Sequence, residues 1–334
     1  MGIGTMEGVF VVSLKKIRFS LPVVALMLTG NVLANKSEDL LAAMESGKCN
    51  PEAVMLHDLA LTGDAVSQLA FANAADKDLC GVVEMWWEYS FDWYRKSAEQ
   101  GNAAAQAALA KHLATHWNRE NETEALVWYQ RAADQGNADA KFGLAQMYGR
   151  GKTKSDNLRK DDKLAIKLYK EAAAAGHEMS WFILSHIYET GSNGEKKDEV
   201  VAAYWYRKSA DKGSPSAQWR LASMYEEGRG VDQDYAEARR WYEKAAAQNH
   251  SYSQTNLAKM YRSGRGGLRD EKLTLQLFHQ AAEAGDSNAQ FELAMIYAKG
   301  LIGMARNEEK SLYWLNESAS SWNPLAIKEL ERQR

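Results

Sequence analysis

Two histidines, His112 and His116, stand four residues apart, a spacing that could do chemistry. In a helix this spacing places both side chains on one face, where two imidazoles can ligate a metal ion. A metal site needs further ligands, and no glutamate adjoins the pair and no third ligand is evident. His112 also falls at a position where other segments carry methionine, namely Met147, Met224 and Met260. We therefore expect core packing at this position and no metal.

Ser155, Asp156 and Asn157 spell a triplet that penicillin-recognising enzymes carry. Its companion Ser-x-x-Lys occurs only at Ser13–Lys16, inside a segment that we expect to be removed, and Lys-Thr-Gly is absent. The chain also has no G-x-S-x-G, no phosphate loop and no Rossmann fingerprint. We therefore expect no enzyme activity and no cofactor, and a hydrolase is the least supported of three functional hypotheses.

The formal net charge is −3, which gives no general attraction to nucleic acid or to an anionic membrane. Aromatic pairs such as Trp205 and Tyr206 could stack on bases, but they recur at positions that a helical core would bury. We therefore expect no nucleic acid among the partners.

The elements that would position any functional side chain are set by an internal repeat, whose successive copies are 35–40 residues apart. Each copy ends in a marker residue: Gly63, Gly101, Gly136, Gly176, Gly213, Asn249, Gly285 and Trp322. Four residues after the marker the residue is always Ser or Ala, and eight after it is Phe71 and then Leu. Twelve after it is Tyr in five successive copies, and a glycine follows three residues later. Agreement at several positions in so many copies indicates one repeated structural unit.

The steps of four keep the small residue, the Leu and the Tyr near one face of a first helix, which the glycine then ends. A second helix follows, with a large apolar or aromatic pair such as Trp241 and Tyr242 and then alanine at Ala246. The marker ends this second helix, and Asn249 replaces glycine there because Asn tolerates the left-handed conformation. Each copy is thus a helical hairpin that buries its apolar face only by stacking on its neighbours.

The segment SAQWRLASMYEEGRGVDQDYAEARRWYEKAAAQN (216–249) resembles the Sel-one-like repeat family, a relative of the tetratricopeptide repeat. The resemblance extends over about residues 63–331. It implies an all-α fold, a right-handed α-solenoid of stacked helical hairpins. We expect an N-terminal helical cap at 35–62, about seven repeats at 63–322 and a C-terminal capping helix at 323–334.

The N-terminus has the pattern of a secretory signal peptide over residues 1–34. Lys15, Lys16 and Arg18 precede an uncharged apolar run at 19–34, which ends in the small residue Ala34. We expect cleavage after Ala34, no membrane span in the mature chain, and a periplasmic or secreted protein, an exported bacterial member of the family. An uncleaved membrane anchor or a buried helix is the alternative.

Cys49 and Cys80 are the two cysteines of the chain. In an oxidising compartment they could form a disulfide near the exposed N-terminal end of the repeat array. Two buried free thiols are the alternative.

The positions that escape the repeat pattern lie 3, 6, 7 and 10 residues after each marker and form a stripe on the first helices. In family members the first helices line the concave face, so the resemblance implies a protein-binding groove there. The stripe residues that we expect to contact a partner are Phe142, Gln146, Met179, Phe182, His186, Ser216, Trp219, Arg220, Ser223, Tyr252, Asn256 and Lys259. We expect Trp219 and Arg220 to lie beside the stripe residues of the next first helix, and Arg220 and Asn256 to be exposed.

Packing between adjacent repeats is the alternative for the aromatic residues at the second of these positions, which are Phe142, Phe182, Trp219 and Phe291. The leading functional hypothesis is an exported scaffold that binds one protein partner. The alternative, which the family resemblance implies, is a periplasmic immunity protein that neutralises a secreted toxic effector such as a phospholipase.

Overall fold

The computed structural model describes residues 30–49, 52–77, 79, 87–115, 119–151 and 158–333. Over these residues it contains 17 helices and no strand, so the expected all-α fold is confirmed. The chain divides into two compact units, residues 1–105 and 106–334. No helix in the described ranges is long and apolar enough to cross a bilayer.

The first unit holds four helices, α1 (Gly30–Glu45), α2 (Glu52–Leu61), α3 (Ala65–Asp76) and α4 (Trp87–Glu99). α1 packs on α2 and α3, and α3 packs on α4. The hydroxyls of Ser37 and Ser67 share a buried hydrogen bond of 2.8 Å between α1 and α3. The rings of Phe71 and Trp93 meet edge to face at 5.5 Å between α3 and α4. α5 (Ala103–Thr115) begins at the end of this unit.

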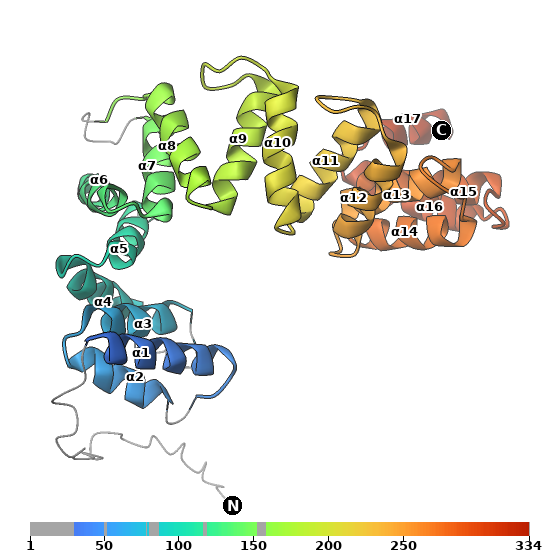
Figure 1. The fold of residues 1–334 in the computed structure, drawn as a ribbon. Helices are drawn as coiled ribbons and strands as arrows, with labels where there is room; N and C mark the ends of the chain where they lie inside the picture. The colour runs from blue at the N-terminus through green and yellow to red at the C-terminus, as the bar shows by residue number, and fades with distance from the viewer. Residues whose placement is uncertain are drawn as a thin grey trace, which may run out of the picture. The chain divides into compact units, whose positions relative to one another are not determined.

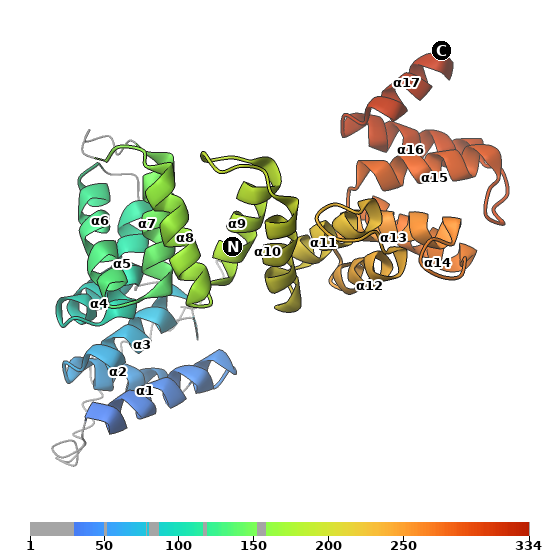
Figure 2. The same ribbon diagram turned by 45° about the horizontal axis from the view of Figure 1, so that its top comes forward.

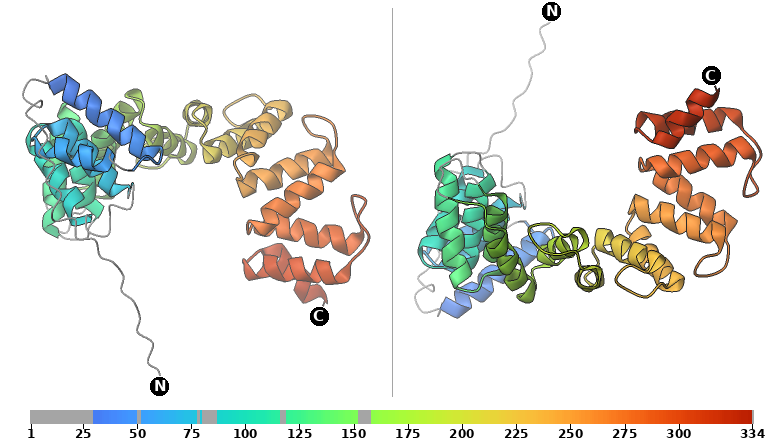
Figure 3. Two further views of the ribbon diagram at one scale, coloured as in Figure 1. Left: turned by 90° about the horizontal axis from the view of Figure 1, so that it is seen from below. Right: turned by 90° about the horizontal axis from the view of Figure 1, so that it is seen from above.

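The second unit is a succession of helical hairpins in which each helix packs on the next (Figures 1 and 2). Its helices are α6 (Arg119–Asp134), α7 (Ala138–Arg150), α8 (Asp162–Ala174), α9 (Glu178–Thr190), α10 (Glu199–Asp211), α11 (Pro215–Glu227), α12 (Tyr235–Ala246), α13 (Ser251–Ser263), α14 (Glu271–Glu283), α15 (Ser287–Lys299), α16 (Glu308–Ser320) and α17 (Pro324–Gln333). Figure 3 shows the orange and red helices of the last hairpins lying side by side as successive rungs. This is the α-solenoid that the repeat predicts.

The small residue four positions after each marker lies in the core between packed helices. In all eight copies this residue has 0% of its surface exposed: Ser67, Ala105, Ala140, Ser180, Ala217, Ser253, Ala289 and Ala326. The Leu one turn later is also buried, as Leu184 and Leu221 show. The marker residues adopt the left-handed conformation, including Asn249 with a φ of 60°. The register assigned from the sequence therefore places the core correctly.

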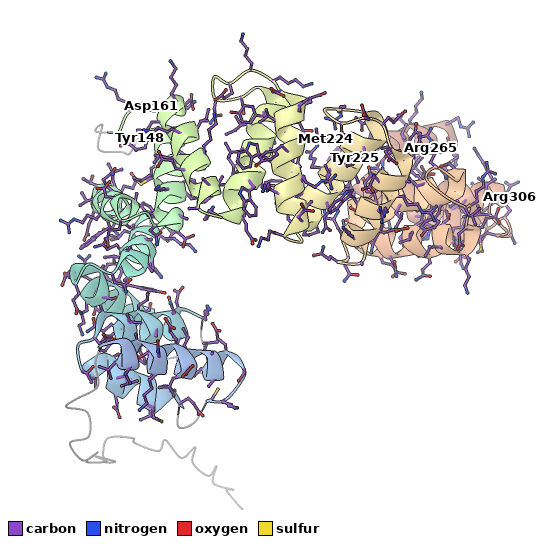
Figure 4. The ribbon with its side chains drawn as sticks, in the orientation of Figure 1. Tyr148, Asp161, Met224, Tyr225, Arg265 and Arg306 are labelled. Carbon is purple, nitrogen blue, oxygen red and sulfur yellow. The ribbon has the colours of Figure 1, made fainter. Side chains whose placement is uncertain are left out.

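The repeated tyrosine lies in the last turn of each first helix, next to the loop to the second. The backbone N–H of Asp161 donates to the carbonyl of Tyr148 at 3.0 Å, and Figure 4 shows the two residues together at the ends of α7 and α8. Asp234 donates to the Tyr225 carbonyl in the same way at 2.9 Å. Since Asp161 and Asp234 also cap the second helices with their carboxylates, each hairpin loop is held at both ends.

Buried glutamines join successive repeats. The Gln218 side-chain amide donates to the carbonyl of Ala210 at 3.1 Å, and its Oε1 accepts from Gln248 Nε2 at 2.9 Å. The Gln135–Gln106 pair repeats the second contact at 2.8 Å. These bonds satisfy polar atoms where repeats stack, and a buried amide without them destabilises the fold.

Gln254 lacks this second contact. The residue that corresponds to Gln248 in the next repeat is Ala284, which has no side-chain donor. The Gln254 Oε1 is therefore buried with no hydrogen-bond donor in the described residues. We predict that Ala284→Gln supplies the donor and raises the free energy of unfolding by about 1 kcal/mol. Chemical denaturation of the two proteins measures this change. Ala175→Gln is the matched control, since the corresponding partner there is Lys141 rather than a glutamine. An equal gain from both substitutions would show that the glutamine does not act through the Gln254 side chain.

Two first helices begin with a histidine cap. The Nδ1 atoms of His177 and His250 accept the backbone N–H of Ser180 and Ser253 at 3.2 and 3.3 Å. Only the neutral imidazole has this free lone pair. Burial lowers the pKa of both histidines, and the nearby carboxylates of Asp139 and Asp286 oppose this effect only in part.

Because folding keeps these histidines neutral, the unfolded chain, with histidine pKa values of about 6.5, binds more protons below that pH. We predict that the free energy of unfolding falls as the pH drops from about 7.5 to about 5, and that the fall levels off below the lowered pKa values of the folded state. His177→Asn with His250→Asn should reduce this fall, since Asn137 caps α7 in the same position. Thermal unfolding at several pH values measures the effect, with His186→Asn at an exposed position as the control. An undiminished pH dependence in the double variant would contradict the role of the caps.

Candidate partner-binding surface

The stripe residues divide into an exposed and a half-buried group. Met179 and Tyr252 each expose 54% of their surface, and Ser216 and His186 are also exposed. The others are half-buried: Phe142, Gln146, Phe182, Trp219, Arg220, Ser223, Asn256 and Lys259. The stripe is therefore only partly available for a partner.

Three of the aromatic residues at this position pack inside the array. The Phe142 ring stacks on His177 with a centroid distance of 4.3 Å and lies 5.6 Å from Tyr169. Phe182 meets Tyr206 edge to face at 6.0 Å. Phe291 packs against the core cluster at the C-terminal end of the array. These contacts favour the interpretation that the aromatic residues at this position pack between repeats.

Trp219 is also half-buried and packs against the core, and its ring joins two first helices. Its ring lies 5.8 Å from that of Tyr252 and 5.9 Å from that of His250, both on or next to α13. The Arg220 guanidinium lies 4.6 Å from the centre of the Trp219 ring, a cation–π contact. The structure thus brings Trp219 and Tyr252 together, as the repeat register predicts. We call Trp219, Arg220, His250 and Tyr252 the aromatic cluster.

Three of the polar stripe residues have partners within the chain. Asn256 donates through its side-chain amide to the Tyr242 hydroxyl at 3.1 Å, and Lys259 lies 3.5 Å from Glu292. The Ser223 hydroxyl donates to the Glu227 carboxylate at 2.9 Å. The expectation that Arg220 and Asn256 are exposed is wrong, since both are half-buried. The repeat pattern shows which face a residue is on, but not whether a nearby residue of the same or a neighbouring helix is its partner.

A half-buried carboxylate beside the aromatic cluster was not identified from the sequence. Glu189, at the end of α9, accepts a hydrogen bond of 2.7 Å from the Tyr206 hydroxyl and one of 3.1 Å from Arg229. Arg220 lies 3.8 Å away. Burial favours the neutral acid, but these hydrogen bonds and the two guanidinium groups outweigh it and lower the pKa of Glu189.

The Glu189 arrangement recurs one repeat later, where Glu226 accepts from Tyr242 at 3.1 Å and lies 3.6 Å from Arg265. Both glutamates stand 13 residues after a marker, and Arg229 and Arg265 stand 16 residues after the next one. This regular spacing was the signal that could have revealed the network. The Glu189 network holds Arg220 against α9 and so orients one side of the aromatic cluster.

One group of side chains has the composition of a catalytic triad. The Ser180 hydroxyl lies 2.9 Å from His177 Nδ1, and His177 Nε2 lies 3.5 Å from Asp139. A nucleophilic serine must reach its substrate, whereas Ser180 is fully buried. Nδ1 also accepts the backbone N–H of Ser180, so this group acts as a helix cap.

Several residues that the sequence analysis considered lie outside the described ranges. They are Ser13–Lys16, Cys80, His116 and the triplet at 155–157. Cys49 is disulfide-bonded, and its pairing with Cys80 stays a prediction. His112 is half-buried on α5. Within the described residues no group of three or more His, Cys, Asp or Glu could hold a metal ion.

Comparison with known proteins places the chain among repeat proteins. The Sel1 repeat model matches residues 88–102, 103–137, 138–177, 182–214, 215–250, 251–286 and 287–321. Among proteins of curated function, none matches significantly.

Two solved structures are similar over most of the chain. One is c5321, a protective antigen of uropathogenic Escherichia coli with an SLR fold, at a TM-score of 0.73 and 26% identity, covering 90% of this chain and 66% of that one. This chain therefore spans just under two thirds of that antigen. The other is a Sel1 repeat protein from Oxalobacter formigenes, at a TM-score of 0.60 and 22% identity, covering 91% of this chain and 89% of that one. Since the repeat model matches well over half of the residues, the chain belongs to the Sel1 repeat family.

Proposed function

We propose that this protein is an exported scaffold that binds a protein partner through the aromatic cluster on α11 and α13. Sel1 repeats generally mediate protein interactions, which supports the general role. The observation that carries the specific proposal is the contact of Trp219 with Tyr252 and Arg220 at the surface of adjacent first helices.

The chemistry of the cluster suits an interface. Trp, Tyr and Arg are the residues most often found as binding hot spots, because they bury a large area and still offer polar contacts. Packing against neighbouring repeats restricts the Trp219 and Arg220 side chains before a partner arrives, which lowers the entropy cost of binding. Met179 and His186 extend the accessible surface along α9.

The narrower role of an immunity protein stays a prediction, since no described residue distinguishes a toxic effector from another protein partner. Similarity to a protective antigen agrees with export, because antibodies must reach such an antigen.

We predict that Tyr252→Ala lowers the affinity for a partner, captured with the mature chain, by at least about tenfold, the loss expected for a hot-spot aromatic residue. The melting temperature should hardly change, because the Tyr252 side chain is largely exposed. Isothermal titration of the purified partner measures the affinity.

Tyr204→Ala provides the matched control, since Tyr204 exposes the same 54% of its surface but lies on the second helix α10. If this variant weakens binding and Tyr252→Ala does not, the partner uses the second helices. Tyr252→Ala is a cleaner probe than Arg220→Glu with Asn256→Arg, because both of those residues have partners within the chain.

Export leads to a separate prediction. Ala34 lies inside α1, so cleavage after it would remove residues 30–34 from the helix and leave Asn35 at its start. Helix α1 would keep its contact with α3 through Ser37 and Ser67. Mass spectrometry of protein from a periplasmic fraction should show Asn35 as the first residue. Intact precursor in the cytosol would contradict the proposed export.

A further inference from the structure

A cleft of about 680 Å³ lies between one face of α8 and the loop that joins α9 to α10. In Figures 1 and 2 this loop extends beyond the helix ends toward α8. Lys163, Lys167 and Lys170 line the cleft together with Ile166, and Asn193 and Glu195 line it from the loop. The proposed partner-binding surface lies on the first helices, so this is a second, separate surface.

The three lysines share one side of α8 because they are four and then three residues apart, about one helical turn each time. The opposite wall is a tight turn in which Asn193 has a φ of 57° and Gly194 a φ of 81°. An ion pair of 3.4 Å between Lys170 and Glu195 ties this turn to α8. This ion pair connects the two walls of the cleft.

The charges around the cleft do not balance. Glu171 lies 3.2 Å from Lys141 of α7, which compensates its charge, and Glu195 is compensated by Lys170. Lys167 lies 4.0 Å from the already paired Glu171 and exposes 71% of its side chain. Lys163 forms no ion pair with any residue that the structure describes. Two ammonium groups thus remain for a ligand, on a chain whose net charge is −3.

We propose that this cleft binds an acidic segment of a protein partner. Acidic side chains would pair with Lys163 and Lys167, and an apolar side chain would lie against the Ile166 side of the cleft. A volume of about 680 Å³ is within the range of about 300–1,000 Å³ that ligand pockets occupy. The long lysine side chains also offer apolar stems beside their charges, which suits a peptide with mixed acidic and apolar residues.

The test is a fluorescence-anisotropy titration of the full chain with a labelled peptide of glutamate and leucine. A second peptide, with glutamine in place of each glutamate, has the same shape without the charge. We expect the acidic peptide to bind, the neutral one to bind at least about tenfold more weakly, and added salt to weaken the acidic complex. Lys163→Gln with Lys167→Gln should lower the affinity for the acidic peptide by about tenfold.

Lys272→Gln with Lys299→Gln makes the same change in net charge on α14 and α15 and should leave the affinity unchanged. Lys163→Glu with Lys167→Glu should abolish acidic-peptide binding and bind a peptide of lysine and leucine instead. All variants alter exposed side chains, so melting temperatures should match the parent and confirm folding. The proposal is overturned if the parent does not bind the acidic peptide, if both double glutamine variants lose binding equally, or if a single-stranded DNA oligonucleotide binds as tightly as the peptide.

Discussion

The close approach of neighbouring helices at one small residue per repeat is the constraint on which the rest of this structure depends. Ser or Ala at this position is fully buried in every copy, from Ser67 to Ala326. A larger side chain would separate the helices and break the packing of the Leu and Tyr residues that follow on the same face. Because each repeat contacts only its neighbours, the same contact must be made again at every step.

Stacking of repeats buries backbone and side-chain amide groups at each interface, and these polar groups need hydrogen-bond partners. Gln218 and Gln135 form such bonds, in which the side chain of one repeat donates to a carbonyl or side-chain amide oxygen of a neighbouring repeat. Glu189 is a charged example, because its carboxylate accepts hydrogen bonds from Tyr206 and Arg229. Such groups stabilise the array only when every partner is present, so the buried Gln254 Oε1 marks a local weakness.

The two proposed binding surfaces lie where the repeat pattern places no constraint. On the first helices this leaves Tyr252 exposed beside Trp219, and on the outer side of α8 it leaves the lysine row. The two surfaces differ in chemistry, since one offers aromatic area and the other offers positive charge. A scaffold with both could bind two segments of one partner, or two partners at once.

The sequence by itself determined the repeat, its register and which positions are buried between helices. The residue types at positions such as Leu221 and Asn249 recur at a period that only stacked hairpins explain. It also determined which residues share the stripe, since helical periodicity sets the face. Only the tertiary structure decided which stripe residues are exposed and which pack or pair with another part of the chain. Phe142 packs on His177, Arg220 faces Glu189 and Asn256 bonds Tyr242, and each of these partners lies on or next to another helix. Periodicity describes one helix at a time, whereas burial and pairing depend on what the neighbouring helix presents.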